Sequence, residues 1–244
     1  MSVLTWRRIH RSLGIVVGVQ LVLWTAGGLF FSLNPIARVR GETEAVEPPP
    51  LDPAQAPASP AAAIQELHAR EPGLEVQTVV LRPHLTGAVY EIAYRVEGEE
   101  RRALARASTG RLRGGVTRDE ALEIARDAYA IASPVAEVSL VSEVEAGSEY
   151  RGHSLPAYRV RFDDALGTRL YVSVERGVVT ARRNNRWRGF DFFRMLHIMD
   201  YQDRDDFNPL LLQGASILGL ITILSGFVLA ALTSPRLRRA FARS

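Results

Sequence analysis

The sequence predicts an α+β fold in which two tandem units, each a helix followed by an antiparallel sheet, are anchored by two transmembrane helices. Three observations predict this fold. Residues 12–37 and 207–235 form two long segments without a charged side chain. Between them, helix-like and strand-like stretches recur at offsets of about 60 to 68 residues. All acidic residues lie between Glu42 and Asp206, whereas both ends of the chain are purely basic.

The composition excludes several classes of site. The 244 residues contain no cysteine, which excludes disulfides, thiolate catalysis, zinc fingers and iron–sulfur clusters. All 30 basic residues are arginine, and seven of them lie at the two ends. The middle of the chain carries 23 arginines against 27 acids, so no basic stripe for phosphates is present and we expect no nucleic-acid partner.

Each uncharged segment exceeds the ~20 residues that a helix needs to cross a bilayer. Because positive charge beside a span stays in the cytoplasm, we expect both termini in the cytoplasm of a bacterium, and the main domain in the periplasm, beyond the inner membrane. A cleaved signal peptide is the alternative for residues 1–33. Its apolar run is long, however, and Phe31–Pro35 offers no small-residue cleavage site, so we expect a retained anchor.

Small residues recur four apart in both spans, as Gly14 and Gly18, Ala215 and Gly219, and Gly226 and Ala230. Such pairs let another helix approach closely, so the spans are expected to pack on each other or between chains. The expected organisation is a cytoplasmic tail, the first transmembrane helix, a linker, two sheet units, an interfacial segment, the second transmembrane helix and a basic cytoplasmic tail, at residues 1–11, 12–36, 37–60, 61–115, 116–181, 182–206, 207–233 and 234–244.

The linker holds six of the thirteen prolines, which predicts an extended, semi-rigid spacer without a site. The first unit then opens with a helix from Pro60, capped by Ser59. The second opens with a helix whose Thr117 and Glu120 are spaced as a capping box. The predicted strands are residues 76–81, 89–96 and 102–107 in the first unit, and 135–144, 157–162 and 168–174 in the second.

The repeat is visible in the residues themselves. Tyr90-Glu-Ile-Ala-Tyr aligns with Tyr158-Arg-Val-Arg-Phe at an offset of 68, and Gly110 aligns with Gly177 at 67. A helix followed by such strands resembles a PepSY domain. The Thr109-Gly110 turn keeps part of that family's Asp-x-x-Thr-Gly hairpin, whereas Glu175-Arg176-Gly177 departs from it. The entry Trp6-Arg-Arg-Ile-His-Arg-Ser-Leu-Gly resembles the PepSY-associated transmembrane helix, which commonly reads His-Arg-x-x-Gly.

The resemblance covers about residues 6–33 and 60–232, and it implies three kinds of function. PepSY units resemble inhibitory segments of metalloprotease propeptides and membrane-anchored extracytoplasmic modules. A branch with such helices is associated with haem-containing ferric reductases of the inner membrane, and so with iron uptake. We therefore expect a module that binds or regulates an extracytoplasmic partner, with a dimeric b-haem electron-transfer protein and a structural subunit of a membrane complex as alternatives.

The five histidines bear on the haem alternative. His68, His84 and His153 are expected on the solvated surface. His10 and His197 lie near opposite membrane faces and are the candidate haem ligands, because a b-type haem takes two axial imidazoles. A core of ~30 Å separates them, so a homodimer would have to pair each histidine with its mate. The other interpretation is that both are ordinary interfacial histidines.

Residues 182–206 mix six aromatics with six arginines, which is typical of the headgroup zone. Phe192, Leu196 and Met199 predict one apolar stripe of an interfacial helix. The four aspartates that follow, Asp200, Asp203, Asp205 and Asp206, either bind a hard cation or pair with nearby arginines. Asn208 and Pro209 are expected to begin the second span. No catalytic motif is present, so a non-catalytic function is expected, with electron transfer as the enzymatic alternative.

Overall fold

The computed structural model describes residues 3–51 and 58–234. Part of the predicted linker, residues 52–57, and nearly all of the predicted basic tail therefore lie outside the described residues. The chain divides into two compact units, one formed by residues 1–35 and 189–244 and the other by residues 36–188. We call them the helical unit and the sheet unit.

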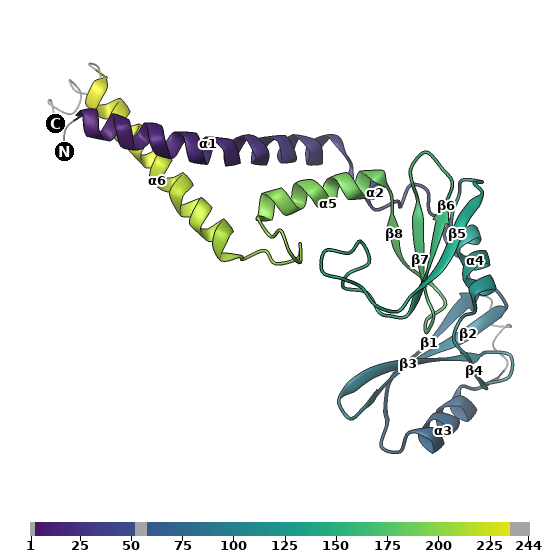
Figure 1. Ribbon diagram of the computed structural model, residues 1–244. Coiled ribbons are helices and arrows are strands. Elements are labelled where there is room, and N and C mark those ends of the chain that lie inside the picture. The colour runs from purple at the N-terminus through teal and green to yellow at the C-terminus, as the bar shows by residue number, and fades with distance from the viewer. Residues whose placement is uncertain (1–2, 52–57, 235–244) are drawn as a thin grey trace. The chain divides into compact units, whose positions relative to one another are not determined.

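The helical unit contains two helices that could cross a membrane (Figure 1). They are α1 (Val3–Leu33) and α6 (Leu210–Thr233). In the most apolar window of each helix only 11% of the residues are buried, whereas the core helix of a soluble protein would be mostly buried. The chain therefore fits a membrane protein with two spans, because exposed apolar surface of this length requires lipid or other helices around it.

The two apolar helices contact each other through the small residues of α6. A Cβ on Gly219 would lie 3.9 Å from Val17 Cγ1, and a Cβ on Gly226 would lie 3.1 Å from His10 Cε1. Gly14 and Gly18 of α1, in contrast, have nothing within 4 Å. The predicted close packing of the spans is thus present at two small residues of α6 and absent at the glycine pair of α1.

The sheet unit contains two four-stranded antiparallel sheets, which confirms the α+β prediction (Figure 1). Both sheets have their strands in sequence order, β1-β2-β3-β4 and β5-β6-β7-β8, and a helix precedes each. The elements are α2 (Ile36–Val39), α3 (Ala61–Arg70), β1 (Glu75–His84), β2 (Gly87–Val96), β3 (Glu99–Arg106), β4 (Leu112–Arg113), α4 (Arg118–Asp127), β5 (Val135–Val141), β6 (Ala157–Phe162), β7 (Arg169–Ser173) and β8 (Val179–Arg183).

The predicted offset of 68 matches the helix-facing side of each sheet. Ala63 and Leu67 of α3 pack on a core that includes Tyr90, Ile92 and Tyr94. The corresponding core under α4 includes the residues 68 positions later, Tyr158, Val160 and Phe162. Alternate strand residues face the same side of a sheet, so the shared pattern positions each helix on the same face of its sheet.

The turns of the two sheets also correspond. Gly110 donates its N–H to the carbonyl of Arg106 at 2.8 Å, and Gly177 donates to the carbonyl of Ser173 at 2.9 Å. Both glycines have a positive φ, 68° and 63°, which glycine adopts without the strain of a Cβ. The first strand of each sheet carries a register shift near its start, between Val76 and Thr78 and between Val135 and Glu137.

Helix starts were predicted with mixed success. Thr117 and Glu120 form both bonds of the predicted capping box. The helix expected from Pro60 begins one residue later, although Ser59 Oγ still accepts from Ala61 N at 3.2 Å. The prediction for Asn208 was wrong, because α6 begins at Leu210 without a side-chain cap. The N–H of Asn208 is instead bonded to Asp206 Oδ1 at 2.8 Å.

The interfacial helix and the linker also differ from expectation. α5 (Asn185–Ile198) is a helix, but Phe190 and Phe193 pack on Phe31 and Phe30 of α1, whereas Phe192 of the predicted stripe is 49% exposed. The described parts of the linker are attached to the sheet unit. Ala130 N donates to the Glu44 carbonyl at 2.9 Å, and Ala58 N donates to the Ala107 carbonyl at 3.2 Å.

Candidate functional site

The first predicted haem ligand, His10, contacts the other span. Its Nδ1 lies 2.8 Å from Ser225 Oγ. The Ser225 hydroxyl donates to the Thr222 carbonyl at 2.7 Å, so the imidazole is the donor of the first bond and its Nε2 carries the lone pair. That nitrogen faces α6, because a Cβ on Gly226 would lie 3.7 Å from it. Within one chain, this environment fits a helix-packing contact better than an axial haem ligand.

The second predicted ligand, His197, lies near the C-terminal end of α5. Its ring centroid is 5.7 Å from that of Trp24 and 6.3 Å from that of Phe31, both on α1. The side chain is exposed, so its nitrogens are accessible. Its neighbour Trp24 is 14 residues from His10 on α1, about 21 Å along the helix, so the two histidines of one chain do not meet. The assignment of both as haem ligands stays a prediction.

The aspartate segment before α6 is organised around Asp200, which is 8% exposed. Its two carboxylate oxygens accept four backbone N–H groups, from Gln202, Asp203, Asp205 and Asp206, at 2.9–3.2 Å. The bonds from Asp206 and the other three N–H groups lower the Asp200 pKa. No cluster of three or more metal-ligating side chains occurs in the part of the chain that the structure describes. The aspartates therefore fit the alternative of local bonding.

Two of the three histidines expected on the solvated surface are half-buried. His68 is exposed on α3, as predicted. His84 has Arg113 Nη1 within 3.5 Å of both ring nitrogens, and a Cβ on Gly177 would lie 2.8 Å from its Nε2. His153 stacks on Tyr150 with centroids 5.0 Å apart. The surface prediction failed for these two because it considered only sequence neighbours.

The main difference between the two sheets is one connection. β1 and β2 are joined by the two residues Leu85 and Thr86, whereas residues 142–156 join β5 to β6. This loop, which we call the cover loop, lies on the face of the second sheet opposite α4. It packs Tyr150, 1% exposed, against Tyr171 of β7 with their rings stacked at 4.4 Å. The cover loop is therefore a packed part of the fold.

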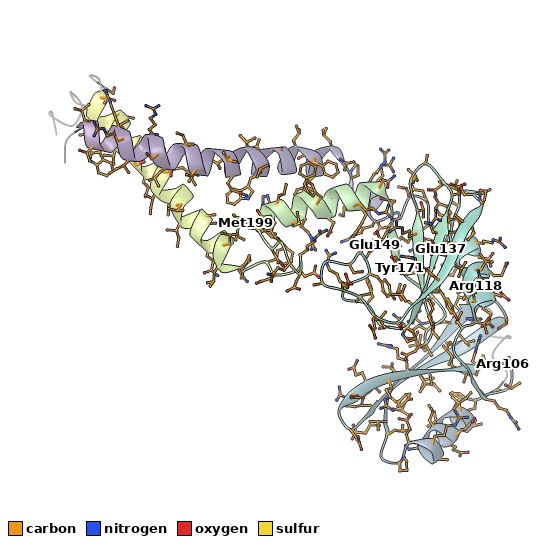
Figure 2. The ribbon with its side chains drawn as sticks, viewed as in Figure 1. Arg106, Arg118, Glu137, Glu149, Tyr171 and Met199 are labelled. Carbon is orange, nitrogen blue, oxygen red and sulfur yellow. The ribbon has the colours of Figure 1, made fainter. Side chains whose placement is uncertain are left out.

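Polar bonds attach the cover loop to the sheet. The Tyr150 hydroxyl donates to the Ser154 carbonyl at 3.0 Å and lies 2.8 Å from Thr180 Oγ1. Glu149 Oε1 accepts from Arg169 at 2.8 Å and from the Tyr171 hydroxyl at 2.7 Å, as Figure 2 allows the reader to follow. Glu149 Oε2 accepts from Arg188 Nε at 3.0 Å. Charge-assisted bonds of this kind are the stronger ones in proteins.

The same bonds shift the pKa values. Burial raises the pKa of Glu149, but the bonds from Arg169 and Tyr171 and the charge of Arg188 outweigh it, so the net pKa is lowered. Burial, together with Glu149, raises the pKa of the Tyr171 phenol. Glu149 is thus ionised and Tyr171 protonated at neutral pH, which makes the pair a fixed acceptor and donor and leaves neither ready to move a proton.

A groove of about 640 Å³ lies between the cover loop and β5. Its walls include Ser139 and Leu140 of β5, Arg159 of β6 and the two stacked tyrosines. Ser139 Oγ and Arg159 Nε are buried there without a hydrogen-bond partner among the described residues. Buried polar atoms normally have partners, so the unused donors in this wall are a site at which a ligand can gain hydrogen bonds.

The edge of the second sheet lies beside this groove. β5 is the first strand of its sheet and pairs only with β6 in the described part of the chain. Its Leu140 is 56% exposed. The sequence predicted the strand but not the groove. The length of the connection between two predicted strands, together with an aromatic residue in its middle, is the signal that would have found it.

A second polar cluster joins the two sheets. Glu91 of β2, 2% exposed, accepts from Arg102 of β3 and from Arg176 of the β7–β8 turn, both at 2.9 Å, and forms an ion pair with Arg82 of β1 at 2.7 Å. Its counterpart 68 positions later is Arg159. This cluster is saturated with charges from the chain itself, so it fits a structural junction between the two sheets.

No family model matches this chain, and no curated protein or solved structure is similar enough to it to indicate a relationship.

Proposed function

We propose that the protein is a membrane-anchored, non-catalytic binding module of tandem PepSY type, whose sheet unit lies in the periplasm and holds an extended segment of a partner protein. The observation that carries this proposal is the unpaired edge of β5 beside the groove under the cover loop. An exposed edge strand offers unpaired N–H and C=O groups, and adding a strand to such an edge is a common mode of peptide recognition.

The groove supplies the side-chain part of recognition. A segment that pairs with β5 points alternate side chains to the two faces of the sheet. Those on the face opposite α4 enter the groove, where the tyrosine rings give apolar contact and Arg159 and Ser139 give donors. Backbone pairing then gives affinity, and the groove gives selectivity.

The other edge, β1, is a poorer site for the same purpose. Its connection to β2 is a two-residue turn, so no loop forms a groove beside it. Its Pro83 has no N–H to donate, and its Arg82 is held by Glu91. We therefore assign partner binding to β5 and use β1 as the internal control.

Site-specific photo-crosslinking tests this assignment in the native membrane. A benzoylphenylalanine at Ser142, which lines the groove and is exposed, should give one discrete adduct with an extracytoplasmic protein. Leu140→Arg should abolish the adduct, because a charged, bulky residue on an edge strand opposes pairing. Val80→Arg places the same residue on β1, where Val80 is 40% exposed, and should leave the adduct unchanged. An adduct that survives Leu140→Arg would contradict the proposal.

The orientation in the membrane needs its own test. Reporter fusions at residues ~120 and ~240 should report opposite sides, with the sheet unit outside, because basic flanks stay in the cytoplasm. Signals from the same side would contradict the two-span arrangement.

The haem-bearing dimer and the structural subunit of a complex stay as predictions. For the first, a detergent-purified chain expressed with ample haem should show a Soret band that shifts on dithionite reduction and weakens in His197→Ala. A colourless, monomeric preparation would eliminate it.

A further inference from the structure

The sheet unit is tied together at the point where the chain enters it and leaves it. Asn184 Nδ2, just after β8, donates to the Arg38 carbonyl, in α2, at 3.1 Å. A Cβ on Gly41, whose φ is 67°, would lie 3.4 Å from Arg182 Cβ. The segment that follows α1 and the segment that leads into α5 are therefore side by side within this unit. We call residues 36–44, 149–153 and 182–188 the neck.

The neck is rich in positive charge. It contains seven arginines and three glutamates. Each glutamate has an arginine partner. Glu149 pairs with Arg188 at 3.0 Å, Glu44 with Arg186 at 3.7 Å and Glu42 with Arg40 at 3.7 Å, as the list of ion pairs in the neck. The excess arginines therefore have no carboxylate of the neck left to neutralise them.

Arg182 is the least compensated of them. It has no carboxylate within ion-pair distance among the described residues, and its Nε is buried without a hydrogen-bond partner there. Burial lowers the pKa of its guanidinium, and the charge of Glu42 offsets this only in part. A half-buried guanidinium that lacks an anion is unfavourable, and an external anion would relieve that cost. Arg38, on the adjoining segment, is exposed.

Trp187 adds an amphipathic ring to the same surface. The guanidinium of Arg183 lies 4.2 Å from its ring centroid, and that of Arg151 lies 5.7 Å away. Tryptophan together with arginine is the composition that sits at the headgroup level of a bilayer, where the ring body is apolar and the polar groups stay hydrated.

Chain length keeps this surface close to a bilayer that contains α1. From Arg11 to Leu33 the helix rises ~33 Å, which matches a hydrocarbon core of ~30 Å. Arg38 follows Leu33 by five residues, so it lies at most ~18 Å along the chain from the end of the helix. An anion within the headgroup layer is therefore within reach of the neck.

We propose that the neck binds the phosphate of an anionic phospholipid headgroup, with Arg38 and Arg182 contributing the charge and Trp187 lying at the headgroup level. The arginines select an anion, and the nearby span selects one that belongs to a lipid. This site is distinct from the β5 edge and does not depend on the partner proposed for it.

Native mass spectrometry of the delipidated full chain in detergent tests the proposal. Phosphatidylglycerol should bind more tightly than phosphatidylcholine. Each arginine near an anionic surface contributes about fivefold to the affinity, so Arg38→Gln with Arg182→Gln should weaken phosphatidylglycerol binding about 25-fold. The matched control is Arg106→Gln with Arg118→Gln, which removes the same charge from residues lying away from Glu149 of the neck (Figure 2) and should leave binding unchanged.

Further arms keep the test decisive. Arg38→Gln alone changes an exposed residue, so its expected fivefold loss cannot be attributed to misfolding. Glycerol phosphate without acyl chains should not compete at the same concentration, because the lipid is also held in the bilayer or micelle. Equal competition by glycerol phosphate or by an acidic peptide would overturn the lipid assignment. Equal losses in the neck and control variants would overturn the site.

Discussion

The two sheets share a topology and differ in what covers the face opposite the helix. In the first sheet that face holds Glu91 and its three arginines, and the β7–β8 turn of the second sheet supplies one of them. In the second sheet the cover loop occupies the corresponding face with Tyr150. The repeated residues thus define the architecture, whereas the residues that are not repeated define the junction and the groove.

The largest effect is expected at the cover loop. Tyr150→Ala should destabilise the full chain by about 4 kcal/mol, because it removes a buried aromatic ring that is stacked on Tyr171 and leaves a cavity. Tyr150→Phe removes only the hydroxyl bonds and should cost about 1 kcal/mol. Urea unfolding in detergent measures both. A small effect of Tyr150→Ala would mean that the cover loop is dispensable and that the two sheets are more alike than their structures indicate.

The sheet junction gives the next effect. Glu91→Gln should cost about 3 kcal/mol, because it leaves three guanidinium groups around a neutral side chain. The matched change Glu137→Gln also removes a carboxylate with two arginine partners, but that carboxylate is 43% exposed. Surface ion pairs contribute little, so this control should lie close to the wild type in the same urea titration. Equal effects of the two changes would refute the structural role of the junction.

Corresponding glycines compare the two repeats directly. A Cβ at Gly110 meets the backbone carbonyl of Ser59, whereas a Cβ at Gly177 meets the side chain of His84, which can move. Gly98 also has a positive φ but has open space around it. We expect costs of about 3, 2 and 1 kcal/mol for Gly110→Ala, Gly177→Ala and Gly98→Ala, respectively. The same denaturation assay checks the order, and an inverted order for Gly110 and Gly177 would contradict these contacts.

The sequence was informative wherever a pattern repeated. The offset of 68 located the helix-facing residues of both sheets, and Thr117 with Glu120 located a helix start. Two strands were missed. β4 has only two residues, and β8 includes Arg182 and Arg183, whose charges suggested a segment outside the sheet. Strand pairing in these cases is set by neighbours distant in sequence, which local propensity does not report.

The candidate sites were harder to predict for the same reason. His10 was selected for its place near a membrane face, but its partner Ser225 lies 215 residues away. The bonds of Asp200 depend on a loop conformation in which its carboxylate gathers four N–H groups. The groove depends on where the cover loop returns across the sheet. None of these long-range placements leaves a periodic pattern, so only the loop length hinted at them.

The smallest effect is a pH dependence that links the two sheets through His84. Burial lowers its pKa below the usual 6.5, Arg113 of β4 lowers it further, and Glu120 of α4 opposes them. Because the unfolded chain binds the proton more readily, stability should fall as the pH drops from 7.5 to 5.5. Burial and Arg183 lower the pKa of His153 in the same direction.

Histidine variants separate these contributions. His84→Gln should flatten part of the stability loss measured by urea unfolding at pH 7.5 and 5.5, and His153→Gln should flatten another part. The control His68→Gln removes an exposed histidine and should follow the wild type. Burial raises the pKa of Glu175, which acts in the opposite direction, so each variant is compared with the wild type at each pH and that contribution cancels. If His84→Gln has the wild-type profile, the contact between His84 and the Gly177 turn does not couple the two sheets to pH.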